Sequence, residues 1–114
     1  MTSGIFSAVF TSSRSGDCGV AIFTGNTIHG GDASHYYRGK YRLDGNNQIS
    51  GAIDVVKYSK LHDSIFGPMT PFRLILTGHV IMNKKQFELS GHVDGQPQLK
   101  IQISLNKLEG LVEG

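Results

Sequence analysis

Apolar and polar side chains alternate with a period of two along most of this chain. In the segment 98–107 every second residue is apolar, namely Leu99, Ile101, Ile103 and Leu105. Successive side chains of a β-strand point to opposite faces of a sheet, so this pattern indicates a strand with one buried and one solvated face. The same alternation recurs in the segments 72–80 and 87–93. The period predicts an all-β protein whose strands share one apolar face.

Turn-forming residues divide the alternating segments into short strands. The pair Gly25-Asn26, the run 44–47 and the run 94–97 each separate two such segments, and residues of these types favour tight reversals of the chain. We therefore expect an antiparallel meander of about eight strands, at residues 3–11, 17–24, 26–30, 35–43, 48–58, 71–80, 86–93 and 98–107.

An eight-stranded, antiparallel, up-and-down barrel is the architecture that we expect from this order. Closure removes the exposed edges that an open sheet would present. Gly78 and Gly91 fall on the apolar side of their strands, where a glycine lets the sheet bend sharply or lets another group approach the backbone. A sandwich of two sheets is the alternative. The 114 residues allow one hydrophobic core, so we expect a single domain over 1–114.

The segment 59–70 interrupts the alternation. It contains Pro68, and Pro71 follows it closely. Its length suits a single helical turn or a lid across one end of the barrel. We expect any movement of the protein to occur here.

Charge and cysteine content indicate which classes of partner the protein binds and in which cellular compartment it occurs. The net charge of +2 comes from 11 basic and 9 acidic residues that are scattered along the chain. Such a balance argues against direct binding to nucleic acid or to an acidic membrane surface. Cys18 is the sole cysteine, so no intrachain disulfide can form, and the first ten residues lack the features of a signal peptide. We expect a cytoplasmic protein.

No pattern in the sequence predicts a metal site, a cofactor or a catalytic residue, and we do not expect an enzyme. The five histidines form no H-x-H or H-x-x-x-H pair, and we expect them on the solvent face of the strands, with His79 and His92 as possible neighbours. Most aspartates occur in turns, where a carboxylate bonds to nearby backbone amides. Asp54 is mid-strand, and we expect it on the outer face beside a basic residue of a neighbouring strand.

The stretch 28–41, "IHGGDASHYYRGKY", concentrates glycines, aromatic and basic residues. Its two glycines allow a reversal or bulge that Asp32 can cap with its own side chain. Strand parity then places Tyr37 and Tyr41 on one face of the following strand. The opposite face carries Tyr36, Arg38, Lys40 and Arg42. This basic face must be solvated or covered by a partner.

Three parts of the chain together resemble the GrlR family, small negative regulators of type III secretion genes in bacteria. They are "DCG" at 17–19, "HGGDASHYYRGKY" at 29–41 and the spacing of both from "SGIFS" near the start. The most specific residues are Gly30, Gly31, Asp32, Tyr37 and Gly39. The resemblance implies a lipocalin-like eight-stranded barrel that forms a homodimer and represses by binding a transcriptional activator protein rather than DNA.

The loop at 44–48 departs from that family. Its best-known members carry an acidic run after the Tyr-x-Gly strand, where this chain has "DGNNQ" with a single carboxylate, Asp44. We expect the missing acidic run to affect which partner the protein binds and not how it folds.

Two functions therefore remain open at the level of sequence. The first is a non-enzymatic interaction protein that binds a protein partner through Tyr36, Arg38, Lys40, Arg42 and Asp44. The second is a barrel that carries a small apolar ligand, because eight strands enclose an interior just large enough for one. Its contacts would be Phe72, Leu74, Leu76, Phe87, Leu89, Leu99, Ile101 and Ile103. The same residues would equally form a filled core.

Overall fold

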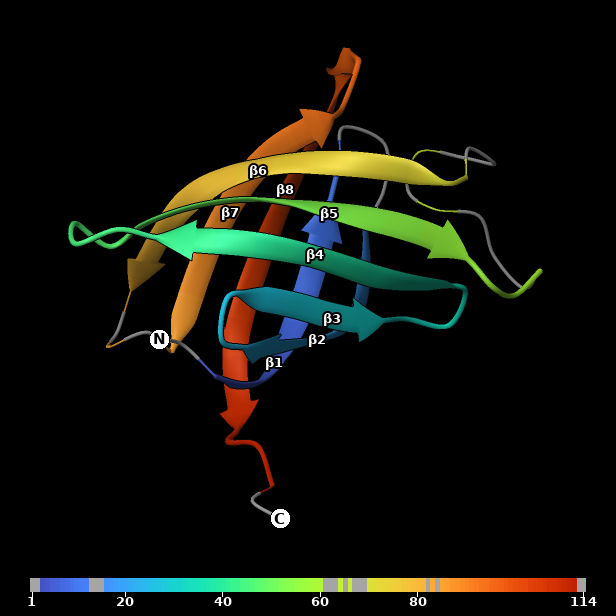
Figure 1. Ribbon diagram of the computed structural model, residues 1–114. Helices are drawn as coiled ribbons and strands as arrows, with labels where there is room; N and C mark the ends of the chain where they lie inside the picture. Colours follow the sequence, from blue (N-terminus) through green and yellow to red (C-terminus); the bar gives the residue numbers. More distant parts are fainter. Residues whose placement is uncertain are drawn as a thin grey trace.

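The protein is a closed eight-stranded antiparallel barrel (Figure 1). A computed structural model describes residues 3–12, 16–60, 64, 66, 70–81, 83 and 85–112. The strands are β1 (Gly4–Thr11), β2 (Gly16–Thr24), β3 (Thr27–Gly31), β4 (His35–Leu43), β5 (Gln48–Lys57), β6 (Phe72–Ile81), β7 (Gln86–Val93) and β8 (Gln96–Glu109). Each strand pairs with the next, and β8 pairs with β1. The expected up-and-down barrel is confirmed, and the sandwich alternative is wrong.

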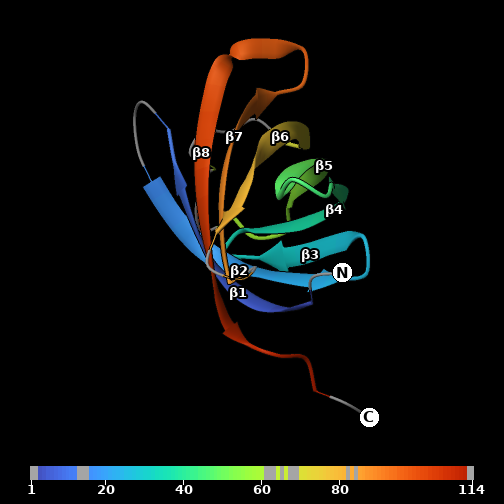
Figure 2. The same cartoon turned by 90° about the vertical axis from the view of Figure 1, so that its left-hand side faces the viewer.

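The strand boundaries agree with the sequence to within one residue, apart from those of β8. That strand begins at Gln96 rather than at 98 and ends at Glu109 rather than at 107. Asp94 and Gly95 complete the reversal alone, because Gly95 adopts a φ of 82° that a turn of this kind requires. At its other end β8 runs alongside β1 as far as the pairing of Glu109 with Ile5. The β7–β8 hairpin projects beyond its neighbours in both views (Figures 1 and 2).

The connections divide the barrel into two ends. The β3–β4 end carries the β1–β2, β3–β4, β5–β6 and β7–β8 connections, and the β4–β5 end carries the other three. Much of the segment 59–70, for which a helical turn or a lid was expected, lies outside the described residues. The described part of the chain contains no helix, and therefore no helix that could cross a membrane.

Aromatic side chains fill the middle of the barrel. Phe6, Phe23 and Phe87 have no exposed surface, and the centroids of their rings lie 4.9, 5.0 and 5.2 Å apart. Rings at this spacing gain both apolar burial and favourable edge contacts. The Tyr41 ring packs against Phe23 on the side of the β4–β5 end. These rings fill the barrel at this level.

Two inward glycines, Gly78 and Gly91, lie close against the backbone of the neighbouring strand. A Cβ atom on Gly78 would lie 2.0 Å from the carbonyl oxygen of Glu88, and one on Gly91 would lie 1.9 Å from that of Ile75. Contacts this short are not tolerated, so no residue with a side chain fits without a shift of the backbone. Of the two roles expected for these glycines, the close approach of a neighbouring group is confirmed.

The two histidines of β6 and β7 lie on the outer face, as expected, but they are not opposite one another. The strand register pairs His79 with Glu88, and it pairs His92 with Ile75. Parity fixes the face of a strand residue but not its partner, which depends on the register.

Candidate functional site

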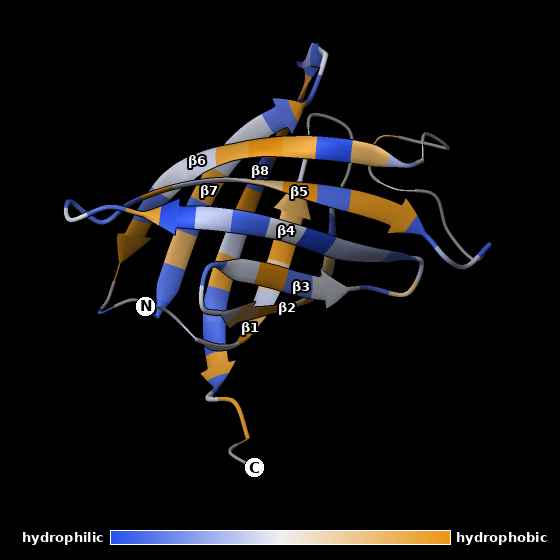
Figure 3. Ribbon diagram, viewed as in Figure 1, coloured by the Kyte–Doolittle hydropathy of each residue, from blue (hydrophilic) through white to orange (hydrophobic). Residues whose placement is uncertain are grey.

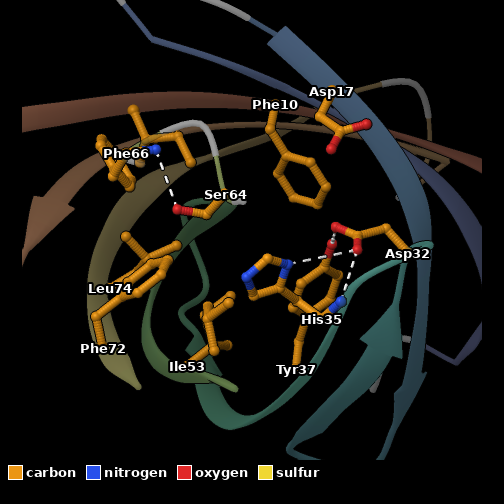
Figure 4. A pocket seen from close by; sticks show the side chains of 12 residues that line it. Phe10, Asp17, Asp32, His35, Tyr37, Ile53, Ser64, Phe66, Phe72 and Leu74 are labelled. Carbon is orange, nitrogen blue, oxygen red and sulfur yellow. Dashed lines mark hydrogen bonds and ion pairs between the residues drawn. The ribbon is translucent and has the colours of Figure 1, made fainter. Parts of the chain in front are cut away.

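A small pocket opens at the β3–β4 end of the barrel and is called here the mouth pocket (Figure 4). Its volume is about 40 Å³. It is lined by Phe10, Asp17, Asp32, His35, Tyr37, Ile53, Val55, Ser64, Phe66, Phe72, Leu74 and Ile101. The walls are mainly apolar. Asp32, His35 and Tyr37 lie on the side of the β3–β4 connection, and Ser64 lies beside Phe66 on the β5–β6 connection. A hollow of this kind suits a ligand with an apolar body and a single polar group.

Asp32 is the centre of the polar side of the mouth pocket. Its Oδ1 accepts hydrogen bonds of 2.8 Å from the backbone amides of Ser34 and His35, which caps the turn between β3 and β4 as expected. Its Oδ2 accepts a hydrogen bond from the phenol of Tyr37. The exposed Tyr58 hydroxyl donates to the carbonyl oxygen of Asp32 over 2.6 Å. The carboxylate therefore has three donors and is held in one position.

These contacts set the ionisation of both side chains. Burial is the largest influence on Asp32 and disfavours its charged form, but the hydrogen bonds from Tyr37, Ser34 and His35 outweigh it and hold the pKa of the carboxyl below its usual value. For Tyr37, burial comes first, followed by the hydrogen bond to Asp32 and its negative charge, and together they raise the pKa of the phenol far above its usual range. The pair is a carboxylate and a neutral phenol at all physiological pH values.

The residues that carry the family resemblance meet at this network. A Cβ atom on Gly19 would lie 3.2 Å from the Tyr37 hydroxyl, 3.2 Å from Cβ of Asp32 and 2.7 Å from the carbonyl oxygen of Gly31. Glycine at position 19 therefore leaves room for the Asp32 to Tyr37 hydrogen bond. Gly30 and Gly39 serve strand packing, since a Cβ atom on either would lie 2.2 Å or less from a backbone oxygen of the neighbouring strand.

His35 is inside the barrel, so the expectation that all the histidines face solvent is wrong. Its exposed fraction is 3%, and it shares the inward parity of Tyr37 and Tyr41. Applying that parity to His35 would have predicted its burial from the sequence. Its Nδ1 lies 3.8 Å from Oδ1 of Asp32, and its Nε2 has no hydrogen-bond partner within the described residues. The Oγ of Ser34 is likewise buried without a partner there.

Serine, histidine and aspartate come together in the mouth pocket without the hydrogen bonds of a hydrolase triad. Ser64 accepts a 3.1 Å hydrogen bond from the amide of Phe66, and no bond joins its hydroxyl to Nε2 of His35. The 3.8 Å separation between His35 and Asp32 also exceeds a hydrogen bond. Among the described residues no three histidine, cysteine or carboxylate side chains are grouped so that they could hold a metal ion.

The interior residues named as ligand contacts divide into three groups. Phe72, Leu74 and Ile101 line the mouth pocket. Leu76 and Leu89 line a second internal space of about 10 Å³. Phe87, Leu99 and Ile103 line neither of these spaces. The sequence did not single out Phe10, Asp17, Ser64 or Phe66 as pocket residues, because the alternation cannot reveal which end of a strand lies beside a loop.

The basic face of β4 lies on the outside of the barrel, with Tyr36, Arg38, Lys40 and Arg42 exposed in one row. In Figure 3 this strand is coloured as mainly hydrophilic. Arg38 and Lys40 line a surface depression of about 480 Å³, called here the outer hollow, whose walls are Thr27, His29, Arg38, Gly39, Lys40, Ala52, Asp54 and Arg73. Tyr36 and Arg42 lie beyond it. Asp44 accepts hydrogen bonds from the amides of Asn46 and Gln48 and thereby forms the β4–β5 turn.

Asp54 is paired across the strands with Arg73, which confirms the expected outer position beside a basic residue. The Nε of Arg73 lies 2.8 Å from Oδ1 of Asp54, and both side chains are about half exposed. The hydrogen bond from Arg73 is the main cause that holds the pKa of Asp54 below its usual value, and the charge of Arg38 adds to it. Asp54 is the one carboxylate among the residues that line the outer hollow.

A third feature is an apolar stripe on the outer face of β1 and β2. Val9, Val20 and Ile22 are 46%, 41% and 36% exposed, and the half-buried Ile5 lies opposite Ile22. Cys18 pairs with Val9 in the strand register and is a free, exposed thiol. These residues are called here the apolar stripe.

Comparison with models of known protein families and with curated proteins finds no match for this chain. The class of the protein is therefore defined by the fold, a closed eight-stranded antiparallel barrel, and its function must be inferred from the surfaces and the pocket described above.

Proposed function

We propose that this protein is a non-enzymatic interaction protein that binds an acidic segment of a partner protein in the outer hollow. The observation that carries the proposal is the composition of that hollow, in which His29, Arg38, Lys40 and Arg73 surround one carboxylate. That carboxylate, Asp54, is already bonded to Arg73. Arg38 and Lys40 therefore offer donors to an incoming carboxylate, and arginine binds such groups with two parallel hydrogen bonds.

The identity of the partner rests on the resemblance to the GrlR family. Those regulators repress by binding a transcriptional activator, and we propose the same class of partner here. The acidic run that is missing from the 44–48 loop leaves the basic outer hollow as the charged surface available for contact. Arg42 and Tyr36 extend this surface along β4 beyond the outer hollow.

A homodimer is part of the same proposal. The apolar stripe supports it, because adjacent apolar side chains on an outer sheet face are stabilised when a second surface covers them. The stripe lies on β1 and β2, whereas the outer hollow lies on β3 to β6. Each subunit of such a dimer would keep its outer hollow available to a partner.

The test is capture of a partner from the native host with purified protein, followed by charge reversal. The double variant Arg38→Glu/Lys40→Glu should lose the partner. The double variant Lys85→Glu/Lys100→Glu removes the same charge from exposed positions outside the outer hollow and should retain it. The captured protein should be a DNA-binding activator, and its DNA binding should decrease when the barrel protein is added.

If Arg38→Glu/Lys40→Glu still captured the partner, the outer hollow would be excluded as the binding site. Equal loss of the partner in both double variants would exclude it as well. Circular dichroism of both variants checks that the barrel is intact. Because the proposed contact is between exposed charges, capture should also weaken as the salt concentration rises.

A further inference from the structure

We propose that the mouth pocket binds a small neutral molecule with an apolar body and one hydroxyl group, of the alcohol or phenol class, whose hydroxyl donates a hydrogen bond to Nε2 of His35. This site is separate from the outer hollow, and its test does not depend on the partner protein.

The first support is the histidine itself. His35 is 97% buried, lines the mouth pocket, and has no partner for Nε2 in the described part of the chain. Figure 4 shows its ring in the middle of the pocket, with one nitrogen towards Asp32 and the other towards the side where Ser64 and Leu74 lie. An unsatisfied buried nitrogen costs about 1 to 3 kcal/mol, so this atom is a favourable point for a ligand to bond.

The second support is the position of Asp32 relative to the histidine ring. Because the carboxylate lies on the Nδ1 side of the ring, at 3.8 Å, it favours the tautomer with its proton on Nδ1. Nε2 then carries a lone pair and accepts. The ligand must therefore supply a donor, which a hydroxyl does and a ketone or ether does not.

Charge excludes other classes of ligand. The Tyr37 hydroxyl and the backbone amides of Ser34 and His35 already donate to Asp32, so none of these three groups is available to bind an anion. The negative charges of Asp32 and Asp17 on the pocket wall repel a carboxylate or phosphate.

The apolar walls define the rest of the ligand. Phe66 and Phe72 meet edge to face, with ring centroids 5.7 Å apart, and Phe10 meets Tyr37 in the same way at 5.4 Å. The volume of about 40 Å³ holds about three water molecules, so it takes a hydroxyl and the carbons next to it. The rest of a ring such as that of phenol would extend into the opening of the pocket at the β3–β4 end. The filled barrel below, at Phe6 and Phe23, excludes a long chain from the interior.

The test is an NMR titration of the full chain with phenol, benzene and benzoate, observing the ring nitrogens of His35. Phenol should bind about tenfold more tightly than benzene, as expected for one hydrogen bond, and should shift the Nε2 resonance. Benzoate should not bind. In His35→Phe, which keeps an aromatic ring but removes the acceptor, phenol and benzene should bind equally.

Several results would overturn the proposal. One is a proton on Nε2 of His35 in the free protein. The others concern the ligands: no binding of phenol, equal binding of phenol and benzene to the unmodified protein, or stronger binding of benzoate than of phenol. Each of these is measured on the unmodified chain, so the outcome does not depend on whether His35→Phe folds.

Discussion

The phenol of Tyr37 donates a hydrogen bond to the carboxylate of Asp32 across the connection between β3 and β4. The two residues are five apart in the chain, and they join the end of one strand to the inward face of the next. Gly19 on β2 leaves the space in which the bond forms. The contact thus ties together three consecutive strands at the rim of the mouth pocket.

Removal of the Tyr37 hydroxyl should destabilise the barrel. Tyr37→Phe retains the ring, which is 6% exposed, but leaves the Asp32 carboxylate with one donor fewer. A hydrogen bond to a charged group contributes about 1.5 to 3 kcal/mol, so the free energy of unfolding in urea should fall by about 2 kcal/mol. Tyr36→Phe is the control, since Tyr36 is 40% exposed on the outer face, and its effect should stay within about 0.5 kcal/mol. Equal effects would mean that the bond to Asp32 adds no stability.

Asp32 should make the stability of the protein sensitive to acid. Its pKa in the folded state is lower than in the unfolded chain, where a free aspartate titrates near about 3.9. The carboxylate therefore stabilises the fold above that pH, and this contribution is lost as the pH falls through the folded pKa. Asp32→Asn should be less stable than the unmodified protein at pH 7, and the difference should shrink below about pH 4. Urea unfolding at a series of pH values measures this difference in the free energy of unfolding. A difference that stays constant with pH would contradict the lowered pKa of Asp32.

The fold was predictable because its signal is local. Alternation and turn residues fix where each strand begins and ends, and a chain of short antiparallel strands closes in sequence order. The start of β8 was predicted two residues too late. Pro97 is typical of a turn and was assigned to it, whereas Asp94 and Gly95 alone complete the reversal.

The mouth pocket was not predictable in the same way. It draws on residues from six strands and from the β3–β4 and β5–β6 connections, so its composition depends on register rather than on spacing. Asp32 was predicted as a turn cap, but its bond to Tyr37 requires the angle of the β3–β4 connection. His35 is the residue that the sequence could have placed, because its parity matches that of Tyr37.

The inward glycines should be intolerant of even one added carbon. In Gly78→Ala the new Cβ would lie 2.0 Å from the carbonyl oxygen of Glu88, and the two strands would have to separate. Overpacking of this kind costs about 1 to 3 kcal/mol. Gly45→Ala is the matched control, because a Cβ atom there meets nothing within 4 Å. In thermal unfolding, the melting temperature should fall strongly for Gly78→Ala and change little for Gly45→Ala. A tolerated Gly78→Ala would show that the close approach of the two strands does not depend on glycine.

Asp54 should oppose the binding of an acidic partner in the outer hollow. Asp54→Asn removes the one carboxylate among the lining residues and releases Arg73, so affinity for the captured partner should rise several-fold. Glu109→Gln, at an exposed position of β8 outside the outer hollow, makes the same change of charge and should have a smaller effect. Surface plasmon resonance measures the affinity of each variant for the partner. Repeating it at two salt concentrations separates the effect of the local contact from the effect of the net charge. An equal rise in both variants would point to net charge alone.

Burial of the apolar stripe between two copies should bring their Cys18 thiols close together. Cys18 is exposed beside Val9 within the stripe, so a short bismaleimide should link two subunits that pack stripe to stripe. Ile22→Lys should abolish both the link and the dimer, because a charge would be buried among apolar side chains. Ile81→Lys is the matched control, since Ile81 is also 36% exposed on a strand but lies outside the stripe. Analytical ultracentrifugation measures the dimer. A dimer that survives Ile22→Lys, or that is lost equally in Ile81→Lys, would place the subunit contact elsewhere.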